Sequence, residues 1–221
     1  MVYYSETKGA GRVEDLVLLT TDRPLSPAEQ QTLFRCLDAE TRERVNRSTV
    51  ASVHQQRLLA SALAREMCAR RLGESPASLR VAVAPGGKPF LPDHPALHFN
   101  VSHTSGRVLC GVSDRPVGVD IERERPFPER VARRCFSPAE LALTGDDPAC
   151  RLRLWTRKEA ATKWRGEGLA AVRALDTTAP EWRDRLFSDR IGAFVFTICE
   201  AGVQPAKPVC RTLDQFMEAI V

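Results

Sequence analysis

The tetrapeptide Ser-Pro-Ala-Glu occurs twice in this chain, at residues 26–29 and 137–140. In each copy the serine can cap a helix, the proline fits the first helical turn, and the glutamate can bond back to the serine amide. The sequence therefore predicts helices that begin after Ser26 and Ser137. Because the two copies lie about half the chain apart, they indicate either a duplicated unit or the chance recurrence of a common capping signature.

The segments that follow each copy have the same order. A longer helix is expected in each half, over residues 54–72 before Gly73 and around residues 151–165 before Gly166 and Gly168. Apolar runs predict strands at residues 13–19, 79–84, 97–103, 107–113, 117–122 and 192–200. We therefore expect an α+β fold with two similar α+β lobes in one chain.

Composition limits the class of protein. A chain of 221 residues with 43% hydrophobic and 27% charged residues is typical of a globular protein. It has no apolar run long enough for a membrane span, and residues 1–12 lack the basic and then apolar order of a signal peptide. We therefore expect a cytoplasmic protein without a membrane partner. The seven cysteines are scattered and form no Cys-x-x-Cys pair, which favours free thiols.

The net charge of +4 favours an acidic partner without identifying it. Arginine dominates the basic residues, and its planar guanidinium suits phosphate or carboxylate groups. The chain lacks the interleaved basic and aromatic residues of an RNA-binding sheet, and so we expect no nucleic-acid partner.

The run VGVDIE at residues 117–122 combines an apolar face with an acidic face. In a strand its three branched apolar residues share one side, while Asp120 and Glu122 share the other. At a rise of about 3.3 Å per residue the two acids are roughly 6.6 Å apart along the strand, so their carboxylates can converge on one cation. The alternative is an edge strand with a solvated acidic face.

The segment WTRKEAATKW at residues 155–164 offers a third acid. Helical spacing puts Trp155, Glu159 and Lys163 on one face, with Lys158 at its border. Alone, Glu159 and Lys163 can be a solvated ion pair. If this helix packs beside VGVDIE, three carboxylates cluster, and a divalent ion relieves their repulsion. Oxygen ligands favour magnesium or manganese over zinc, and such an ion typically binds a substrate diphosphate.

Other polar motifs exclude some chemistries. GGKP at residues 86–89 predicts a tight turn that presents a lysine, with a plain surface turn as the alternative, and the P-loop pattern is absent. Ser102 and His103 point to opposite faces of a strand, so we do not expect a nucleophile and its base. His94 and His98 have helical spacing, but two nearby prolines disfavour a helix, and no zinc site is expected there.

Together these pieces resemble the 4′-phosphopantetheinyl transferases of the single-chain, surfactin-synthetase-activating type. The resemblance rests on five stretches in family order: GGKPFL (86–91), FNVSH (99–103), GVDIE (118–122), RCFSPAE (134–140) and WTRKEAATKWRGEGL (155–169). The tryptophan and the Lys-Glu-Ala residues of the last stretch resemble the subgroup tied to polyketide and nonribosomal peptide assembly lines, and fatty acid synthesis is another setting for this family.

The resemblance implies two lobes related by a pseudo-twofold axis, with the active site in the cleft between them. Residues 1–113 would form the lobe with coenzyme A contacts, and residues 114–221 the lobe with the metal site and carrier contacts. The implied reaction transfers 4′-phosphopantetheine from coenzyme A to a serine of an apo acyl or peptidyl carrier protein, releases adenosine 3′,5′-bisphosphate, and needs only a monomer. The competing hypotheses are a magnesium-dependent nucleotide pyrophosphatase and a non-catalytic module that binds an acidic protein or nucleic acid.

The same resemblance implies roles for individual residues. Asp120, Glu122 and Glu159 would be the ligands of magnesium, or of manganese. The implied coenzyme A contacts are Arg57, Lys88, Pro89, Ser102, His103, Lys158 and Lys163. The candidate catalytic residues are Glu159, Lys163 and His103. Glu159, or a water on the metal, would take the serine proton, and Lys163 would stabilise the leaving bisphosphate.

The stretch RERPFPERVARRC at residues 123–135 fills the place where family members contact the carrier. Carrier proteins are acidic, so basic residues here could steer them, namely Arg123, Arg125, Arg130, Arg133 and Arg134. Phe127 is expected to pack on an apolar patch of the carrier. The alternative is a solvated basic helix face.

Overall fold

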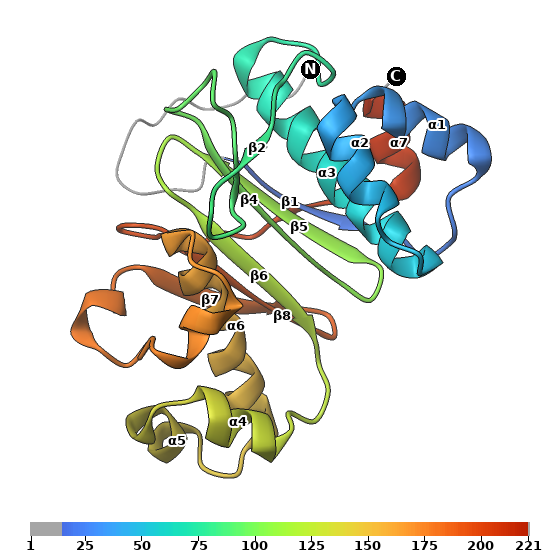
Figure 1. Ribbon diagram of the computed structural model, residues 1–221. Coiled ribbons are helices and arrows are strands. Elements are labelled where there is room, and N and C mark those ends of the chain that lie inside the picture. Colours follow the sequence, from blue (N-terminus) through green and yellow to red (C-terminus); the bar gives the residue numbers. More distant parts are fainter. Residues whose placement is uncertain (1–14, 221) are drawn as a thin grey trace.

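A computed structural model describes residues 15–220 of the chain (Figure 1). Its strands are β1 (Asp15–Thr20), β2 (Ala82–Val83), β3 (Pro89–Phe90), β4 (His98–Thr104), β5 (Arg107–Ser113), β6 (Gly118–Arg123), β7 (Leu186–Ile191), β8 (Phe194–Cys199) and β9 (Val209–Thr212). Its helices are α1 (Pro27–Arg35), α2 (Ala39–Asn46), α3 (Ala51–Leu72), α4 (Glu129–Cys135), α5 (Pro138–Thr144), α6 (Pro148–Arg165) and α7 (Leu213–Ile220). Two 3-10 helices, η1 (Leu169–Arg173) and η2 (Pro180–Trp182), follow α6.

The N-terminal half contains a four-stranded sheet in the order β4-β5-β1-β9, in which β9 comes from the end of the chain. Neighbouring strands are antiparallel except for β1 and β9, which are parallel. The long helix α3 covers one face of this sheet, where Leu63 and Met67 join Val108 and Val112 in the core. Burial of this continuous apolar face is the main force that holds α3 on the sheet.

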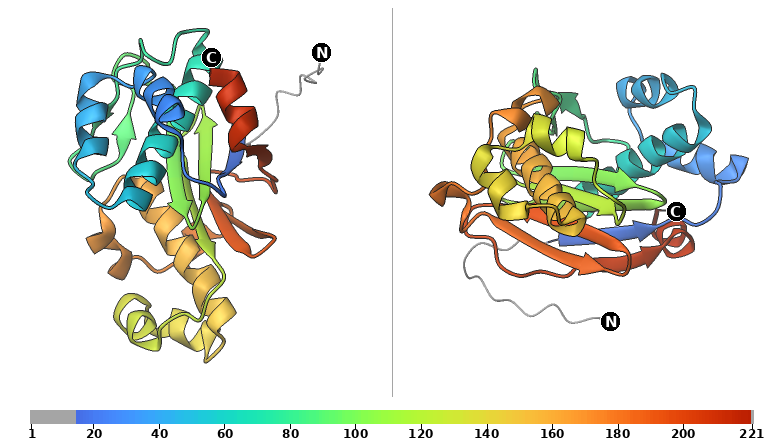
Figure 2. Two further views of the ribbon diagram at one scale, coloured as in Figure 1. Left: turned by 90° about the vertical axis from the view of Figure 1, so that its right-hand side faces the viewer. Right: turned by 90° about the horizontal axis from the view of Figure 1, so that it is seen from below.

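The C-terminal half contains a three-stranded antiparallel sheet in the order β6-β8-β7. Helix α6 packs on β6 and β8, and Figure 2 shows that α3 and α6 cover different sheets. Val119 and Ile121 of β6 share a core cluster with Leu18 and Leu109 of the N-terminal sheet. The apolar side of VGVDIE therefore joins the two halves, while its acidic side faces α6.

The local signals of the sequence agree with this fold, and the expected α+β class with two halves is confirmed. Ser26 and Ser137 both form complete capping boxes at the starts of α1 and α5. Gly73 and Gly166 end α3 and α6 with φ values of 71° and 72°, a left-handed conformation that favours glycine. All seven cysteines lie within the described residues and are free thiols.

The predicted strand at residues 79–84 is wrong in extent. Only Ala82 and Val83 form a strand, and it pairs with β3 alone. Leu79 and Val81 are buried because they pack into the N-terminal core, so their apolar alternation reflects packing rather than a long sheet ladder. The predicted strand at residues 13–19 begins at Asp15 in the structure, and its first two residues lie outside the described residues, as do residues 1–12 of the signal-peptide prediction.

The end of the chain returns to the N-terminal half. Strand β9 pairs with β1, and Leu213 and Phe216 of α7 join the core under α3. The division at residues 113 and 114 stays a prediction, and this returning segment belongs with the N-terminal sheet. Among residues 15–220, no helix combines the length and the apolar character that crossing a membrane requires.

Side chains of β4 dock β6 at the boundary between the halves. The Val119 amide donates to Asn100 Oδ1 at 2.9 Å, and the Ile121 amide donates to Ser102 Oγ at 3.4 Å. The two acceptors are two residues apart on β4, and the two donors are two residues apart on β6. Side chains on one face of FNVSH therefore supply hydrogen-bond acceptors for the amides along one edge of β6. This docking fixes where the acidic side of β6 lies.

Gly118 provides a test of how tightly β6 and α6 pack. A Cβ atom at Gly118 would lie 2.1 Å from the Ala160 carbonyl oxygen and 2.5 Å from the Trp164 amide nitrogen. We predict that Gly118→Ala lowers the free energy of unfolding by about 1–3 kcal/mol, measured by urea denaturation. Gly168→Ala is the matched control, because its Cβ would meet nothing closer than the Gly86 carbonyl oxygen at 3.7 Å. Equal stability of the two variants would contradict the tight packing.

Candidate active site

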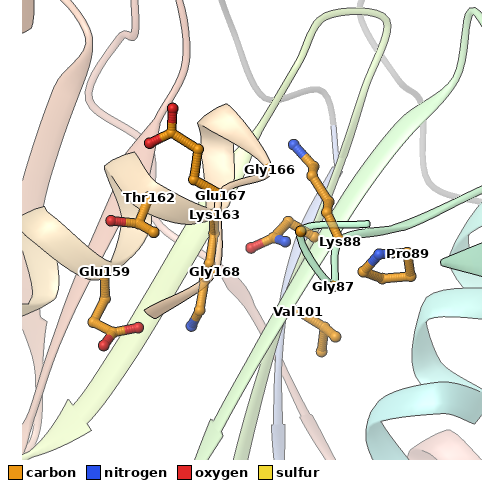
Figure 3. A pocket seen from close by; sticks show the side chains of 12 residues that line it. Gly87, Lys88, Pro89, Val101, Glu159, Thr162, Lys163, Gly166, Glu167 and Gly168 are labelled. Carbon is orange, nitrogen blue, oxygen red and sulfur yellow. The ribbon is translucent and has the colours of Figure 1, made fainter. Parts of the chain in front are cut away.

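A pocket of about 210 Å³ opens between the two halves of the protein (Figure 3). Its walls are the turn at residues 86–89, Asn100 and Val101 of β4, and the C-terminal end of α6 with the loop to Gly168. The structure therefore brings three of the motifs, which lie far apart in the sequence, to one place.

Glycines allow the turn at residues 86–89 to touch α6. A Cβ atom at Gly86 would lie 1.8 Å from the Gly166 carbonyl oxygen, and Gly87 has a φ of +88°. The predicted tight turn is therefore present, and it is a contact between the halves rather than a solvated surface turn. Only glycine permits this close approach of the two backbones.

The Lys88 ammonium reaches across the boundary. It donates to the carbonyl oxygens of Val117 and Trp164 at 3.0 and 3.1 Å. Burial lowers the pKa of Lys88 to about 8, because the charged form loses hydration. Pro89 lies beside Lys88 in the pocket wall, and contact of either residue with coenzyme A remains a prediction.

Asp120, Glu122 and Glu159, here called the acid cluster, come together because α6 packs on β6. Asp120 and Glu159 are only 4% and 8% exposed, which excludes the solvated acidic face. Burial, and after it the charge of the nearby Asp120, raises the pKa of Glu159 to about 7 against the opposing effect of Lys163. Burial and Asp120 also raise the pKa of Glu122. Glu122 and Glu159 therefore both experience the charge of Asp120.

Lys163 and Ser102 hold one oxygen of the acid cluster. The Lys163 ammonium lies 2.7 Å from Asp120 Oδ1 and 3.0 Å from Ser102 Oγ. The Ser102 hydroxyl donates to the same Asp120 oxygen at 2.8 Å. The other oxygen, Asp120 Oδ2, is buried and has no hydrogen-bond partner among the described residues. A buried carboxylate oxygen without a donor is costly and marks a place for a ligand.

The acid cluster matches the chemistry of a hard divalent cation. In the part of the chain that the structure describes, no group of three or more His, Cys, Asp or Glu side chains is already arranged to hold a metal ion. The donors are nonetheless all carboxylate oxygens, one of them buried without a partner, and two of the acids have raised pKa values. A divalent cation would relieve this crowding of negative charge.

The expected coenzyme contact by Lys158 is wrong. Its ammonium donates to Glu140 Oε2 at 2.6 Å, and both side chains are completely buried. It also donates to the Leu175 carbonyl oxygen. Lys158 therefore points into the C-terminal half, where it ties α6 to α5 and cannot reach a ligand in the pocket.

A second hollow, of about 430 Å³, lies next to the first and shares Val101 with it. Arg57 and His103 line this hollow, while Ser102 faces Asp120 on the other side of β4. Burial and the nearby cations Lys163 and Arg57 lower the pKa of His103. The opposite directions of Ser102 and His103 agree with the alternation predicted for a strand.

Two cations of the second hollow were not predicted from the sequence. Arg44 and Arg47 line it from α2 and its C-terminal cap. They belong to none of the motifs, and only the packing of α2 against α3 brings them beside Arg57. Their one-turn spacing was the available signal, but many surface helices carry such residues.

The five arginines of the segment at residues 123–135 are exposed, as expected, whereas its aromatic residue and Ala132 are buried. Phe127 is 6% exposed and stacks on Phe136, with ring centroids 5.6 Å apart. The expectation that Phe127 contacts a carrier is therefore wrong, since this side chain fills the core between α4 and α6. The exposed apolar side chain nearby in the sequence is Leu143 of α5, at 69%.

Two family models match consecutive parts of the chain. The model for the 4′-phosphopantetheinyl transferase superfamily matches residues 116–199. A model for the N-terminal part of 4′-phosphopantetheinyl transferases matches residues 23–114. The two matches meet at the boundary between the sheets.

Curated relatives give the same result. A 4′-phosphopantetheinyl transferase of Bacillus subtilis is 34% identical over 154 residues, which cover 67% of this chain and 69% of the relative. The 4′-phosphopantetheinyl transferase Sfp of Bacillus subtilis strain 168 is 33% identical over the same shares. The 4′-phosphopantetheinyl transferase HetI of Nostoc is 32% identical over 184 residues, with 73% of this chain and 76% of the relative covered.

The two lysines of α6 should differ in their effect on stability. Lys158→Met leaves the buried Glu140 without its counter-ion, and we predict a loss of about 3–5 kcal/mol in the free energy of unfolding. Lys163→Met is the matched control, because the Lys163 side chain is 26% exposed, and we expect a loss of about 1 kcal/mol. Urea denaturation of both variants measures the difference. Similar losses in the two would show that Lys158 is not the structural lysine.

Proposed function

Because the chain belongs to the 4′-phosphopantetheinyl transferase superfamily, we propose that it transfers 4′-phosphopantetheine from coenzyme A to a serine of an apo acyl or peptidyl carrier protein. Adenosine 3′,5′-bisphosphate is the second product. The observation that supports this most is the acid cluster with Lys163 at the edge of a pocket between the halves. Phosphoryl transfer requires this combination of charge stabilisation and proton acceptance.

The acid cluster would hold magnesium, with manganese as a substitute. A divalent cation bound there supplies positive charge that offsets the charge of the coenzyme diphosphate. The fit rests on the three carboxylates and on the unpartnered oxygen of Asp120 within residues 15–220.

Glu159 is the proposed acceptor of the serine proton. Its raised pKa of about 7 supports this role, because a general base works best when its pKa lies near the working pH. Lys163 follows Glu159 by one helical turn, and its ammonium is proposed to stabilise the leaving bisphosphate.

Cations of the second hollow are proposed to bind the phosphate at the nucleoside end of coenzyme A. Arg57 and His103 were expected there, and Arg44 and Arg47 add two more donors. Guanidinium groups bind phosphate in a bidentate manner. Ser102, Lys88 and Pro89 are proposed to complete the coenzyme site from the N-terminal half.

The finer identity of the enzyme is part of the same proposal. The proposed subgroup is the one tied to polyketide and nonribosomal peptide synthesis, because Trp155, Lys158, Glu159 and Ala160 resemble its motif. We propose that the N-terminal half contacts coenzyme A and that the C-terminal half carries the acid cluster and contacts the carrier. A monomer suffices, because one chain supplies both walls of the pocket.

Intact mass of an apo carrier protein tests the reaction directly. After incubation with this protein, coenzyme A and magnesium, we expect an increase of one phosphopantetheine group that disappears with EDTA. Asp120→Ala should lower the rate at least about 100-fold, because it removes a ligand of the proposed cation. Asp114→Ala is the control, since Asp114 is an exposed acid that pairs with Arg71 at 3.1 Å outside the pocket.

Near-normal transfer by Asp120→Ala would refute the metal assignment. Release of phosphopantetheine without any carrier would instead favour a nucleotide pyrophosphatase. If several acyl and peptidyl carriers show no increase in mass although coenzyme A binds, the protein is a binding module rather than a transferase.

The exposed arginines of α4 are proposed to attract the acidic carrier. Arg133 and Arg134 lie in the last turn of α4, and the Arg133 side chain is 72% exposed. We predict that Arg133→Glu with Arg134→Glu raises the KM for the carrier about tenfold and leaves kcat nearly unchanged, measured with a purified apo carrier. Arg35→Glu on α1 is a control with a single charge reversal in the other half, and it should leave the KM for the carrier unchanged. An unchanged KM in the α4 variant would show that these arginines only face solvent.

A further inference from the structure

We propose that Lys163 is the resident counter-ion of the acid cluster and that a divalent cation displaces its ammonium from Asp120 when it binds. This inference rests on the proposed function, because it concerns the same acids. It goes further by giving Lys163 two successive partners, first an aspartate of its own chain and then an anionic substrate.

Lys163 already occupies the position of a cation in the acid cluster. Its ammonium is 2.7 Å from Asp120 Oδ1, and Ser102 Oγ contacts both groups. Glu159 lies one turn earlier on α6, and Figure 3 shows its carboxylate and the Lys163 amino group at the same end of the pocket. The Lys163 ammonium therefore contacts Asp120 directly and lowers the pKa of Glu159 through its charge.

The contacts of Asp120 are divided unequally between its two oxygens. Oδ1 receives both the Lys163 ammonium and the Ser102 hydroxyl, whereas nothing in the described residues donates to the buried Oδ2. A divalent cation attracted to this carboxylate would come within a few ångströms of the ammonium. The Asp120 side chain is 6% exposed, so little water screens the repulsion between the two cations.

The balance of charge favours the divalent cation once it arrives. Lys163 offsets one negative charge of the acid cluster, and Arg125 contributes only a 3.5 Å contact to Glu122 from the exposed side. A divalent cation offsets two charges and binds oxygen directly. The Lys163 side chain is 26% exposed and ends a long flexible stem, so it can leave Asp120 without disturbing α6.

The released ammonium would remain at the pocket. Lys163 is part of the pocket wall together with Gly166 and Gly168 at the end of α6. A diphosphate there would replace Asp120 as its anionic partner. Metal and substrate would then favour each other's binding, because each removes the interaction that opposes the other.

Direct binding of Mn²⁺ without coenzyme A or carrier tests the proposal. Isothermal titration calorimetry compares the wild-type protein with Lys163→Met, which lacks the competing charge. We expect Lys163→Met to bind Mn²⁺ at least about tenfold more tightly than the wild type. Lys163→Arg keeps the charge and should stay within about threefold of the wild type. Arg165→Met removes an exposed charge from the same helix and should change the affinity less than about twofold.

Unchanged or weaker Mn²⁺ binding by Lys163→Met would overturn the proposal, and so would undetectable binding by both proteins. Thermal unfolding checks that each variant is folded, and Lys163→Gln replaces Lys163→Met if the latter is not. Failure of the proposed transferase function is a separate result, because it appears as the absence of a mass increase on carriers whatever the Mn²⁺ affinities are.

Discussion

The docking of β6 on β4 is the interaction on which the rest of the structure depends. Within residues 15–220 no strand pairs with the edge of β6 that faces the N-terminal half, and Asn100 and Ser102 accept amide hydrogen bonds from this edge instead. Leaving a buried amide without a partner costs about 1–3 kcal/mol, so these two side chains matter more than their single bonds suggest. FNVSH is therefore first a structural motif, and Ser102 becomes part of the site because it also contacts Asp120.

The docking of β6 on β4 places the Asp120 carboxylate in a buried position with little access to water. The position of the Asp120 side chain follows from the docking of β6. Asp120 lies between the two docked residues of this strand, so its side chain points toward α6. Its burial leaves negative charge that Lys163 only partly offsets, and the pKa values of Glu122 and Glu159 are raised first by their own burial and then by the charge of Asp120. A protein gains no stability from such an arrangement. The excess charge is better understood as preparation for a cationic ligand and a phosphate.

The sequence predicted what depends on local chemistry. Residues within about four positions of one another determine these features. They are the helix caps, the glycines that end helices, the alternation along VGVDIE and the shared helical face of Glu159 and Lys163. The sequence alone did not reveal contacts between distant segments. Phe127 was expected to be exposed, but the packing of α4 on α6 buries it. Strand β9 pairs with β1 although nearly the whole chain separates the two strands in sequence. Arg44 and Arg47 became site residues only when α2 was positioned beside Arg57.

The two Ser-Pro-Ala-Glu copies show how far a local pattern determines a role. Both form the same capping box, yet Glu29 pairs with Arg23 near the surface, whereas Glu140 is fully buried against Lys158. Lys158 and Lys163 are about 140° apart around α6, so one faces α5 and the other faces Asp120. Glu140 thus binds one face of α6 through Lys158, while the opposite face of α6 directs Glu159 and Lys163 toward β6. The second tetrapeptide therefore supports the site through Glu140, whereas the glutamate of the first tetrapeptide pairs near the surface and does not contact the site.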